Sequence, residues 1–241
     1  MEKRGSHVGI ILSFAMFVVF LVFLYSITEP AIRTQTDKEF LLDYLKQGIL
    51  ERSSAEMTST TISSRGGLAN NYNCLEINYS LMGIEDPTNI SLVAYNETSP
   101  LSSNFAGGYL YIGGFAEGKE FFKIYYSEES LNNNAEDIGS CARTVKEEEY
   151  TIGLIRTTKY IFESRIIELI NDSKSDYVGV KEELKVPIGN EFDFSFRYSN
   201  GTTIGTGEKT ITTSIYAEET PIQYIDKKAN TNPGFINIRI W

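Results

Sequence analysis

The chain has 241 residues, a formal net charge of −10, two cysteines and one histidine. A chain this acidic lacks the basic face that nucleic acid phosphates require, and it is poorly suited to broad electrostatic adhesion to anionic lipid. The single histidine, His7, lies near the N-terminus. The rest of the chain therefore lacks the residue that Ser-His-Asp, Cys-His and HExxH sites use.

The first predicted element is residues 8–27, an uncharged apolar run. A helix of that length spans about 30 Å, the thickness of a bilayer's hydrocarbon core. Large apolar side chains on every side predict a retained transmembrane helix. The alternatives are a buried core helix and a cleaved secretory signal, whose apolar region is usually shorter. Lys3 and Arg4 precede the run, so the positive-inside rule predicts a cytoplasmic N-terminal head (residues 1–7) and an extracellular remainder.

Residues 28–52 follow as an amphipathic stalk helix. Helical spacing places one set of residues on a single stripe: Leu41, Tyr44, Leu45, Gly48 and Ile49. The start of this helix has two interpretations. Thr28 or Glu29 caps a new helix with Pro30 in its first turn, or one continuous helix bends at Pro30. In either case we expect the apolar stripe to pack on the domain that follows.

Residues 53–73 are rich in Ser, Thr, Gly and Asn and predict a linker, with residues 58–63 as a candidate edge strand. Residues 74–241 predict a β-rich domain, because apolar and polar residues alternate in most of its segments. The expected strands are 74–81, 90–95, 105–115, 119–126, 149–161, 191–198, 209–217, 223–225 and 235–241. The segment 149–161 has a helix beginning at Ile155 as its alternative.

Two further helices are expected, at residues 162–169 and 176–184, and a turn is expected at residues 232–234. The predicted fold class is therefore α+β. An N-terminal transmembrane helix with an amphipathic extension precedes a mainly antiparallel β extracytoplasmic domain with one or two helices.

Cys74 and Cys141 both lie in the predicted outer part. An even pair on the oxidising side of a membrane predicts one disulfide, and two unpaired buried thiols are the alternative. The bridge would close a loop of some 67 residues and contribute about 3–4 kcal/mol by restricting the unfolded chain.

Five N-x-S/T sequons are also consistent with the exterior, at Asn78, Asn89, Asn96, Asn171 and Asn200. Three of them fall close together between residues 78 and 98. That segment is predicted to bear glycans if the host glycosylates.

The sequence predicts no catalytic, cofactor-binding or metal-binding residue. Residues 113–120 nearly match a phosphate-binding loop, but Glu120 replaces its Ser or Thr, which favours a hairpin turn. Asn132, Asn134 and Glu136 alternate as calcium ligands do, yet the loop lacks the expected glycine and bidentate Glu. The tyrosines and phenylalanines between residues 109 and 126 are expected to be mostly core, and the outward-facing ones could bind a partner or a sugar.

The N-terminal Lys3-Arg4-Gly5-Ser6, followed directly by the apolar helix, resembles the class III leader of archaeal type IV pilin-like proteins. The resemblance implies cleavage between Gly5 and Ser6, with the hydrophobic helix left on the mature protein. It also implies a long helix carrying a β-rich head, with the helices packed together in a filament core. Ser6 stands where the family usually has Gln, and Ile10 where it usually has Glu, which favours a minor subunit.

We therefore expect a non-enzymatic, single-pass cell-surface protein that serves as a pilin-like subunit or minor component of a filament or envelope assembly. The alternative is a signal-anchored extracellular domain that binds a sugar or protein, and an envelope hydrolase ranks third. The expected partners are the membrane and other filament or envelope subunits. The sequence specifies no small-molecule ligand, and it predicts no nucleic acid partner and no cofactor.

Overall fold

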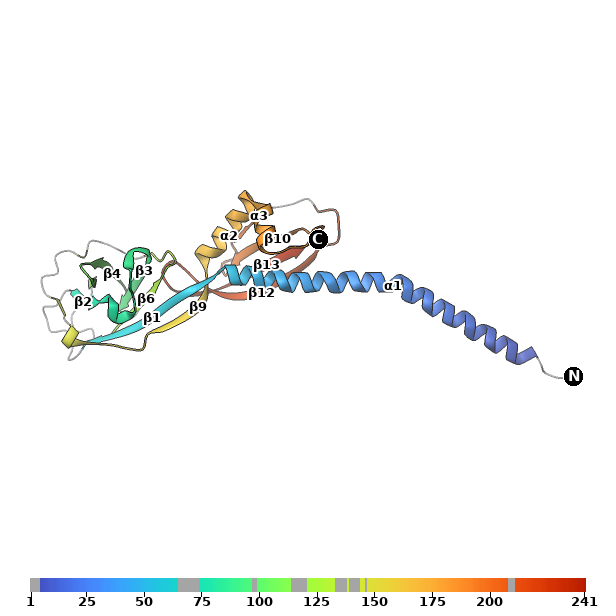
Figure 1. Cartoon of the computed structure of the whole chain (residues 1–241), viewed down its shortest axis with the longest axis horizontal. Helices are drawn as coiled ribbons and strands as arrows, with labels where there is room; N and C mark the ends of the chain where they lie inside the picture. Colours follow the sequence, from blue (N-terminus) through green and yellow to red (C-terminus); the bar gives the residue numbers. More distant parts are fainter. Residues whose placement is uncertain are drawn as a thin grey trace.

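The architecture comes from a computed structural model that describes residues 5–64, 74–96, 99–113, 121–132, 138, 144–145, 147–207 and 211–241. Figure 1 shows an elongated molecule in which two β-rich lobes lie end to end and one long helix projects toward the N-terminus. The described helices are α1 (Gly5–Arg52), α2 (Glu163–Ser175) and α3 (Tyr177–Glu183). The described strands are β1 (Ser54–Ser64), β2 (Cys74–Asn78), β3 (Ser91–Asn96), β4 (Ser99–Ala106), β5 (Tyr109–Gly113), β6 (Phe121–Ser127), β7 (Thr144–Val145), β8 (Tyr150–Ile152), β9 (Arg156–Phe162), β10 (Phe192–Tyr198), β11 (Thr203–Gly205), β12 (Tyr216–Ile225) and β13 (Thr231–Ile240).

Helix α1 is one continuous helix of 48 residues that runs through Pro30. The sequence left open a new helix at Thr28 or Glu29, and the continuous helix is the alternative that the structure supports. Figure 1 shows α1 bending between its projecting half and the half that lies on a lobe. A proline inside a helix removes one backbone donor, and prolines are a common cause of such bends.

The proximal lobe consists of the C-terminal half of α1, helices α2 and α3, and strands β9–β13. Its part of the sheet has the order β11-β10-β13-β12-β9. One buried cluster joins all three helices to β10, β12 and β13, so the three helices pack on the same face of the sheet. Its fully or almost fully buried members include Leu45, Ile49, Ile166, Phe192, Phe196, Ile238 and Ile240.

The distal lobe is inserted into the proximal one. Strand β1 leads away from α1, and β9 returns antiparallel to it with Ser54 opposite Ile161 and Ser59 opposite Arg156. The chain between β1 and β9 forms the distal lobe. In space, the sheet continues on the far side of β1 through β6, β3, β4, β5, β2 and β7. Strand β4 pairs with β3 at its start and with β5 over the rest of its length, so the sheet folds over its own core. That core includes Ile62, Leu75, Ile77, Leu110, Ile112 and Phe122.

The predicted α+β class is confirmed, with an N-terminal apolar helix and a mainly antiparallel sheet. Helices α2 and α3 lie where two helices were expected, but α2 continues past its expected end at Leu169 to Ser175, and the two helices are separated at Asp176. The expected strand at 149–161 is divided into β8 and β9 by residues 153–155, so the helical alternative from Ile155 is wrong.

The predicted linker is wrong over residues 53–64. There the chain forms β1, which lies between β6 and β9 inside the sheet and not at an edge. Only Met57 and Ile62 are large buried apolar residues in this strand, so its own sequence gives a weak signal. Threonine and serine fit a pleated strand well when neighbouring strands supply the apolar contacts. The remainder of the predicted linker, residues 65–73, lies outside the described part.

Two predictions near the C-terminus are also wrong. Residues 211–215 are not in a strand, and β12 begins only at Tyr216. The turn expected at residues 232–234 lies inside β13, and the chain reverses instead after Asp226, whose carboxylate accepts the backbone N–H groups of Lys228 and Asn230. Gly234 serves close packing: a Cβ there would lie 2.7 Å from the ring of Phe196.

The packing of α1 predicts unequal costs for two substitutions on this helix. Leu45 is fully buried, so Leu45→Ala should lower the free energy of unfolding by about 2–5 kcal/mol. Phe40→Ala removes a larger side chain, but Phe40 is 74% exposed and the change should cost well under 1 kcal/mol. Urea unfolding of the full chain in detergent measures both. Equal losses would contradict the docking of α1 described above.

Candidate functional site: the junction between the apolar helix and the proximal lobe

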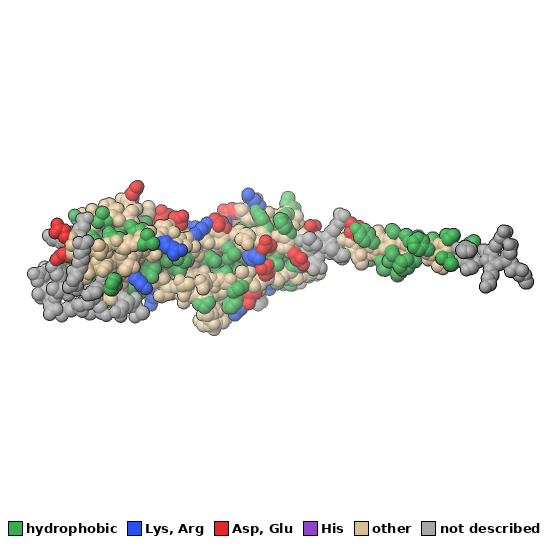
Figure 2. Space-filling view, turned by 90° about the horizontal axis from the view of Figure 1, so that it is seen from below, with side chains coloured by type: hydrophobic (Ala, Val, Ile, Leu, Met, Phe, Trp, Pro, Cys, Tyr) green, Lys and Arg blue, Asp and Glu red, His purple; other side chains and the backbone are tan. Residues whose placement is uncertain are grey.

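The N-terminal half of α1 is the most apolar surface of the molecule. Residues Val8–Glu29 form a helix that is long and apolar enough to cross a membrane, and none of its most apolar stretch is buried against the rest of the chain. Figure 2 shows hydrophobic side chains on the projecting part of this helix. The hydroxyl of Thr28 donates to the carbonyl of Leu24 at 3.0 Å, so this polar group is satisfied within the helix. A signal sequence near an N-terminus can also meet this requirement of length and composition, so the helix alone does not establish a membrane span.

The C-terminal half of α1 is held by buried apolar contacts. Leu41, Leu45 and Ile49 lie in the core of the proximal lobe, as the helical stripe predicted. Tyr44, placed on that stripe by the sequence, is 42% exposed, while Leu42 is buried instead. The stripe is therefore rotated slightly toward Leu42. Gly48 lies where an added Cβ would be 3.0 Å from Leu184, so a small residue permits the close approach of the segment that follows α3.

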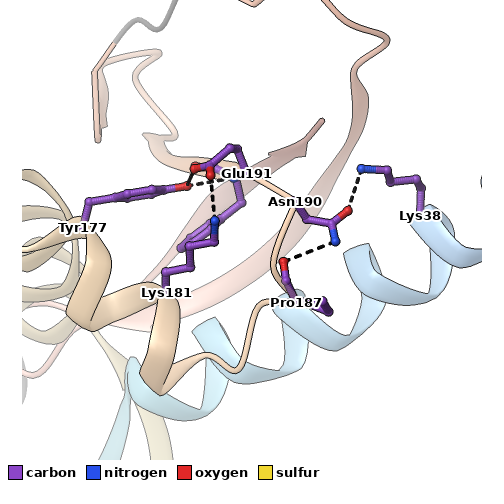
Figure 3. Close-up of polar contacts among 7 residues, drawn as sticks. Lys38, Tyr177, Lys181, Pro187, Asn190 and Glu191 are labelled. Carbon is purple, nitrogen blue, oxygen red and sulfur yellow. Dashed lines mark hydrogen bonds and ion pairs between the residues drawn. The ribbon is translucent and has the colours of Figure 1, made fainter.

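Polar contacts also hold the C-terminal half of α1 on the proximal lobe, at three positions along the helix. Lys38 Nζ donates to Asn190 Oδ1 at 2.7 Å (Figure 3). Lys46 Nζ lies 2.6 Å from Asp43 and 2.9 Å from Glu218 of β12, and hydrogen bonds to these two carboxylates raise the pKa of Lys46. Arg52 pairs with Glu183 at the end of α3.

Tyr177, at the start of α3, forms hydrogen bonds with the residues at the beginning of β10. Its hydroxyl donates to Glu191 Oε2 at 2.6 Å and accepts the backbone N–H of Phe192 at 3.0 Å. Lys181 binds the other oxygen of the same carboxylate at 2.6 Å (Figure 3). Burial, followed by the hydrogen bond to Glu191, raises the pKa of Tyr177 well above its ordinary value. The phenol therefore stays protonated. Its partner Glu191 directly follows Asn190, which binds Lys38 of α1.

A groove of about 670 Å³ lies beside these contacts, between the flank of α1 and the loop that precedes β10. Its lining is mostly apolar and includes Phe40, Leu41, Tyr44 and Pro187, with Lys38 and Lys185. Phe40 is largely exposed, and Ile188, which follows Pro187 in the same loop, is fully exposed. The arrangement offers apolar contact area and no nucleophile–base pair, and the described residues hold no group of three His, Cys, Asp or Glu side chains that could bind a metal.

The predicted site residues fall in several places. Gly5 is the first residue of α1 and Ser6 the second, and their side chains lie outside the described part. Cys74 is fully buried in β2 and disulfide-bonded. Cys141, its predicted partner, is not among the described residues, so the pairing stays a prediction.

The five sequons differ in exposure. Asn89, Asn171 and Asn200 are exposed, Asn78 is half-buried, and Asn96 is only 6% exposed. Asn78 Oδ1 accepts the backbone N–H and the hydroxyl of Ser80, the third residue of its sequon. A glycan on Asn96 would require β3 to open, so we expect the exposed positions to be modified first.

Sequence reasoning missed the polar part of the junction. Asp193 lies on the face of β10 opposite Phe192, Phe194 and Phe196, and that face is also covered there. Asp193 is 2% exposed and binds Arg239 of β13 through two hydrogen bonds of 2.8 and 2.6 Å. The sequence gives no local signal for a cross-strand ion pair such as Asp193–Arg239, because its two residues lie far apart in the chain.

Comparison of the chain with family models, with curated proteins and with solved structures found no match. The architecture described above, an exposed apolar helix continuous with the core of a β-rich domain, is therefore the basis for functional inference.

The raised pKa of Tyr177 predicts how stability changes in alkali. Above about pH 10 the tyrosine of the unfolded chain loses its proton first, so the folded chain binds more protons and its free energy of unfolding falls as pH rises. Tyr177→Phe should lower stability by about 1–3 kcal/mol at neutral pH, since the backbone N–H of Phe192 and one carboxylate oxygen of Glu191 each lose their hydrogen bond to the hydroxyl.

The same variant should also flatten the alkaline decline. Urea midpoints of the full chain measured between about pH 9 and 11 test this. Tyr109→Phe, on an exposed residue, serves as the control. A slope identical in wild type and Tyr177→Phe would show that this phenol does not contribute to the pH dependence.

The buried, disulfide-bonded Cys74 predicts a redox-dependent stability. Cys74→Ser should lower the melting temperature under oxidising conditions, because the bridge no longer restricts the unfolded chain. The melting temperature of the wild type measured in reductant should approach that of Cys74→Ser. A melting temperature that Cys74→Ser leaves unchanged would remove the bridge from the account of stability.

Proposed function

We propose that this chain is a non-enzymatic, single-pass surface protein, a pilin-like subunit or minor component of a filament or envelope assembly. Its N-terminal head lies in the cytoplasm, α1 crosses the membrane, and both lobes are extracellular. The observation that carries the proposal is the continuity of α1. One half supplies buried residues to the core of the proximal lobe, and the other half projects as an uncovered apolar helix.

The spacing along α1 favours an assembly over a domain that rests on lipid. The apolar span ends at Glu29, and among the described side chains of α1 the first contact with the lobe is the one made by Lys38. Nine residues of helix rise roughly 13 Å, whereas the headgroup layer on each side of a bilayer is about 5–7 Å thick. The lobe therefore stands clear of the headgroups, and the exposed flank at Phe40 is available to neighbouring protein.

A signal-anchored binding domain is the second candidate. The observation that favours it is the distal lobe, which is inserted between β1 and β9 and has a core separate from the one that holds α1. An anchor needs only the proximal lobe, so the insertion points to an additional binding role at the outer end of the molecule.

The mature N-terminus distinguishes the two candidates. A pilin-like subunit should begin at Ser6 in intact-mass measurement of the protein purified from its own membranes, and a plain anchor should retain Met1. Recovery of a soluble protein lacking about the first 31 residues would contradict both.

Cross-linking tests the assembly itself. Phe17→Cys places a thiol in the projecting helix, and Val178→Cys places one on exposed α3. In oxidised membranes we expect disulfide-linked dimers or adducts from the α1 variant, with Phe14→Cys and Val18→Cys sampling other sides of the helix. The α3 variant should give fewer. A membrane-inserted protein that yields no α1 adduct at any of these positions would favour the anchor.

A further inference from the structure

The outer face of the distal lobe near β1 carries a row of polar and aromatic side chains. Ser59 of β1 lies opposite Tyr125 of β6 on one side and Arg156 of β9 on the other. Thr61, two residues along the same face, lies opposite Lys123. Cross-strand partners share a face of the sheet, so these five side chains are neighbours. The opposite face of β1 contributes Ile62 to the distal core, whereas on this face Met57 is buried at the junction of the lobes and Ser59 and Thr61 are half-buried.

A groove of about 150 Å³ lies on this face. It is lined by Ser59, Thr60, Thr61, Lys123, Tyr125 and Leu154. Leu154 lies in the segment between β8 and β9 and is 84% exposed, so it forms an apolar wall beside hydroxyl groups. The groove has room for about one sugar ring, and both its apolar and its hydrogen-bonding surfaces face solvent.

The charge on this face is opposite to that of the whole chain. Lys123 and Arg156 are exposed, and neither forms an ion pair with another described residue. On the described part of this face, the strands β1, β3, β6 and β9 contribute no Asp or Glu. A cationic face on a chain of net charge −10 is complementary to an anionic ligand.

Two more cations lie beside this face. Tyr95 of β3 is the cross-strand partner of Lys123, and its hydroxyl donates to the backbone carbonyl of Lys228. Lys227 and Lys228 are exposed in the loop between β12 and β13. The acidic residue of that loop, Asp226, accepts backbone and side-chain N–H groups of its own loop. Positive charge thus extends from the groove toward the proximal lobe.

We propose that this groove binds an acidic sugar, a uronate unit within a polysaccharide. Lys123 and Arg156 bind the carboxylate, Ser59 and Thr61 hydrogen-bond the ring hydroxyls, and Tyr125 and Leu154 contact the apolar ring face. A guanidinium and an ammonium group form charge-assisted hydrogen bonds with carboxylates, and aromatic side chains contact the C–H face of a sugar ring. Lys227 and Lys228 contact the next sugar units of the polysaccharide. The site requires neither the membrane anchor nor a filament, so it is independent of the proposed function.

A uronate fits this site better than a nucleic acid does. Nucleic acid binding requires several basic contacts along a line of closely spaced phosphates, and the rest of this acidic chain would repel so dense a polyanion. A uronate polymer carries one carboxylate per sugar and interposes neutral hydroxyl groups. The groove places one cation, Lys123, beside hydroxyl-bearing and apolar side chains, and Arg156 lies next to it as the cross-strand partner of Ser59.

Calorimetric titration of the full chain in detergent with oligogalacturonate tests the proposal. The fully methyl-esterified oligosaccharide is the matched ligand, because it keeps the sugar and removes the charge. We expect binding of the acid and at least about tenfold weaker binding of the ester. The double variant Lys123→Gln/Arg156→Gln should lose at least about tenfold in affinity with an unchanged melting temperature, because both side chains are exposed.

The control is Lys174→Gln, at an exposed position near the end of α2 in the proximal lobe, and it should leave binding unchanged. Equal binding of acid and ester, or wild-type affinity in the double variant, would overturn the proposal. An equal loss in Lys174→Gln would reduce the effect to net charge and would also overturn it. Tighter, Lys123-dependent binding of single-stranded DNA would assign the groove to nucleic acid instead.

Discussion

The structure depends on one helix that must satisfy two environments. Residues 41–49 of α1 place an apolar stripe into the core of the proximal lobe, while residues 8–29 carry apolar side chains that the chain itself never covers. An exposed apolar surface of this size is costly in water and favourable in a bilayer or against similar helices. Because the helix is continuous, the position of the lobe is fixed relative to whatever surrounds the apolar half.

The two lobes are joined by more than the strands that run between them. Met57, Phe162 and Ile225 belong to a third buried cluster at the junction. The loop between β12 and β13 also reaches the distal lobe, where the backbone N–H of Asn132 donates to the carbonyl of Lys227 at 2.6 Å. These contacts hold the outer face of β1 at a set distance from α1. The distal lobe lies at the end of the molecule opposite the apolar half of α1 (Figure 1), so the proposed groove would be far from the proposed membrane span.

The sequence predicted those parts of the structure whose signal is local. The uncharged run at residues 8–27, the stripe through Leu41 and Ile49 and the alternating phenylalanines of β10 each carry their own periodicity. It failed at β1, where the apolar contacts come from neighbouring strands, and at Gly234, which looks like a turn residue but serves close packing against Phe196. The junction contacts and the basic face were not predictable, because the Lys38–Asn190 pair is set by the docking of α1 on the lobe and the Ser59–Arg156 pair by sheet register.

The central claim is that α1 is one helix shared between a bilayer and the core of a lobe. Amide hydrogen exchange of the full chain in lipid nanodiscs measures this directly along the helix. The account predicts slow exchange over residues 8–27, protected by lipid, and over residues 41–50, protected by the lobe. It predicts faster exchange in between, over residues 30–37, which separate the apolar span from the docked half of the helix. Fast exchange across residues 8–27 in nanodiscs, or no difference between the intervening segment and the two protected ones, would contradict it.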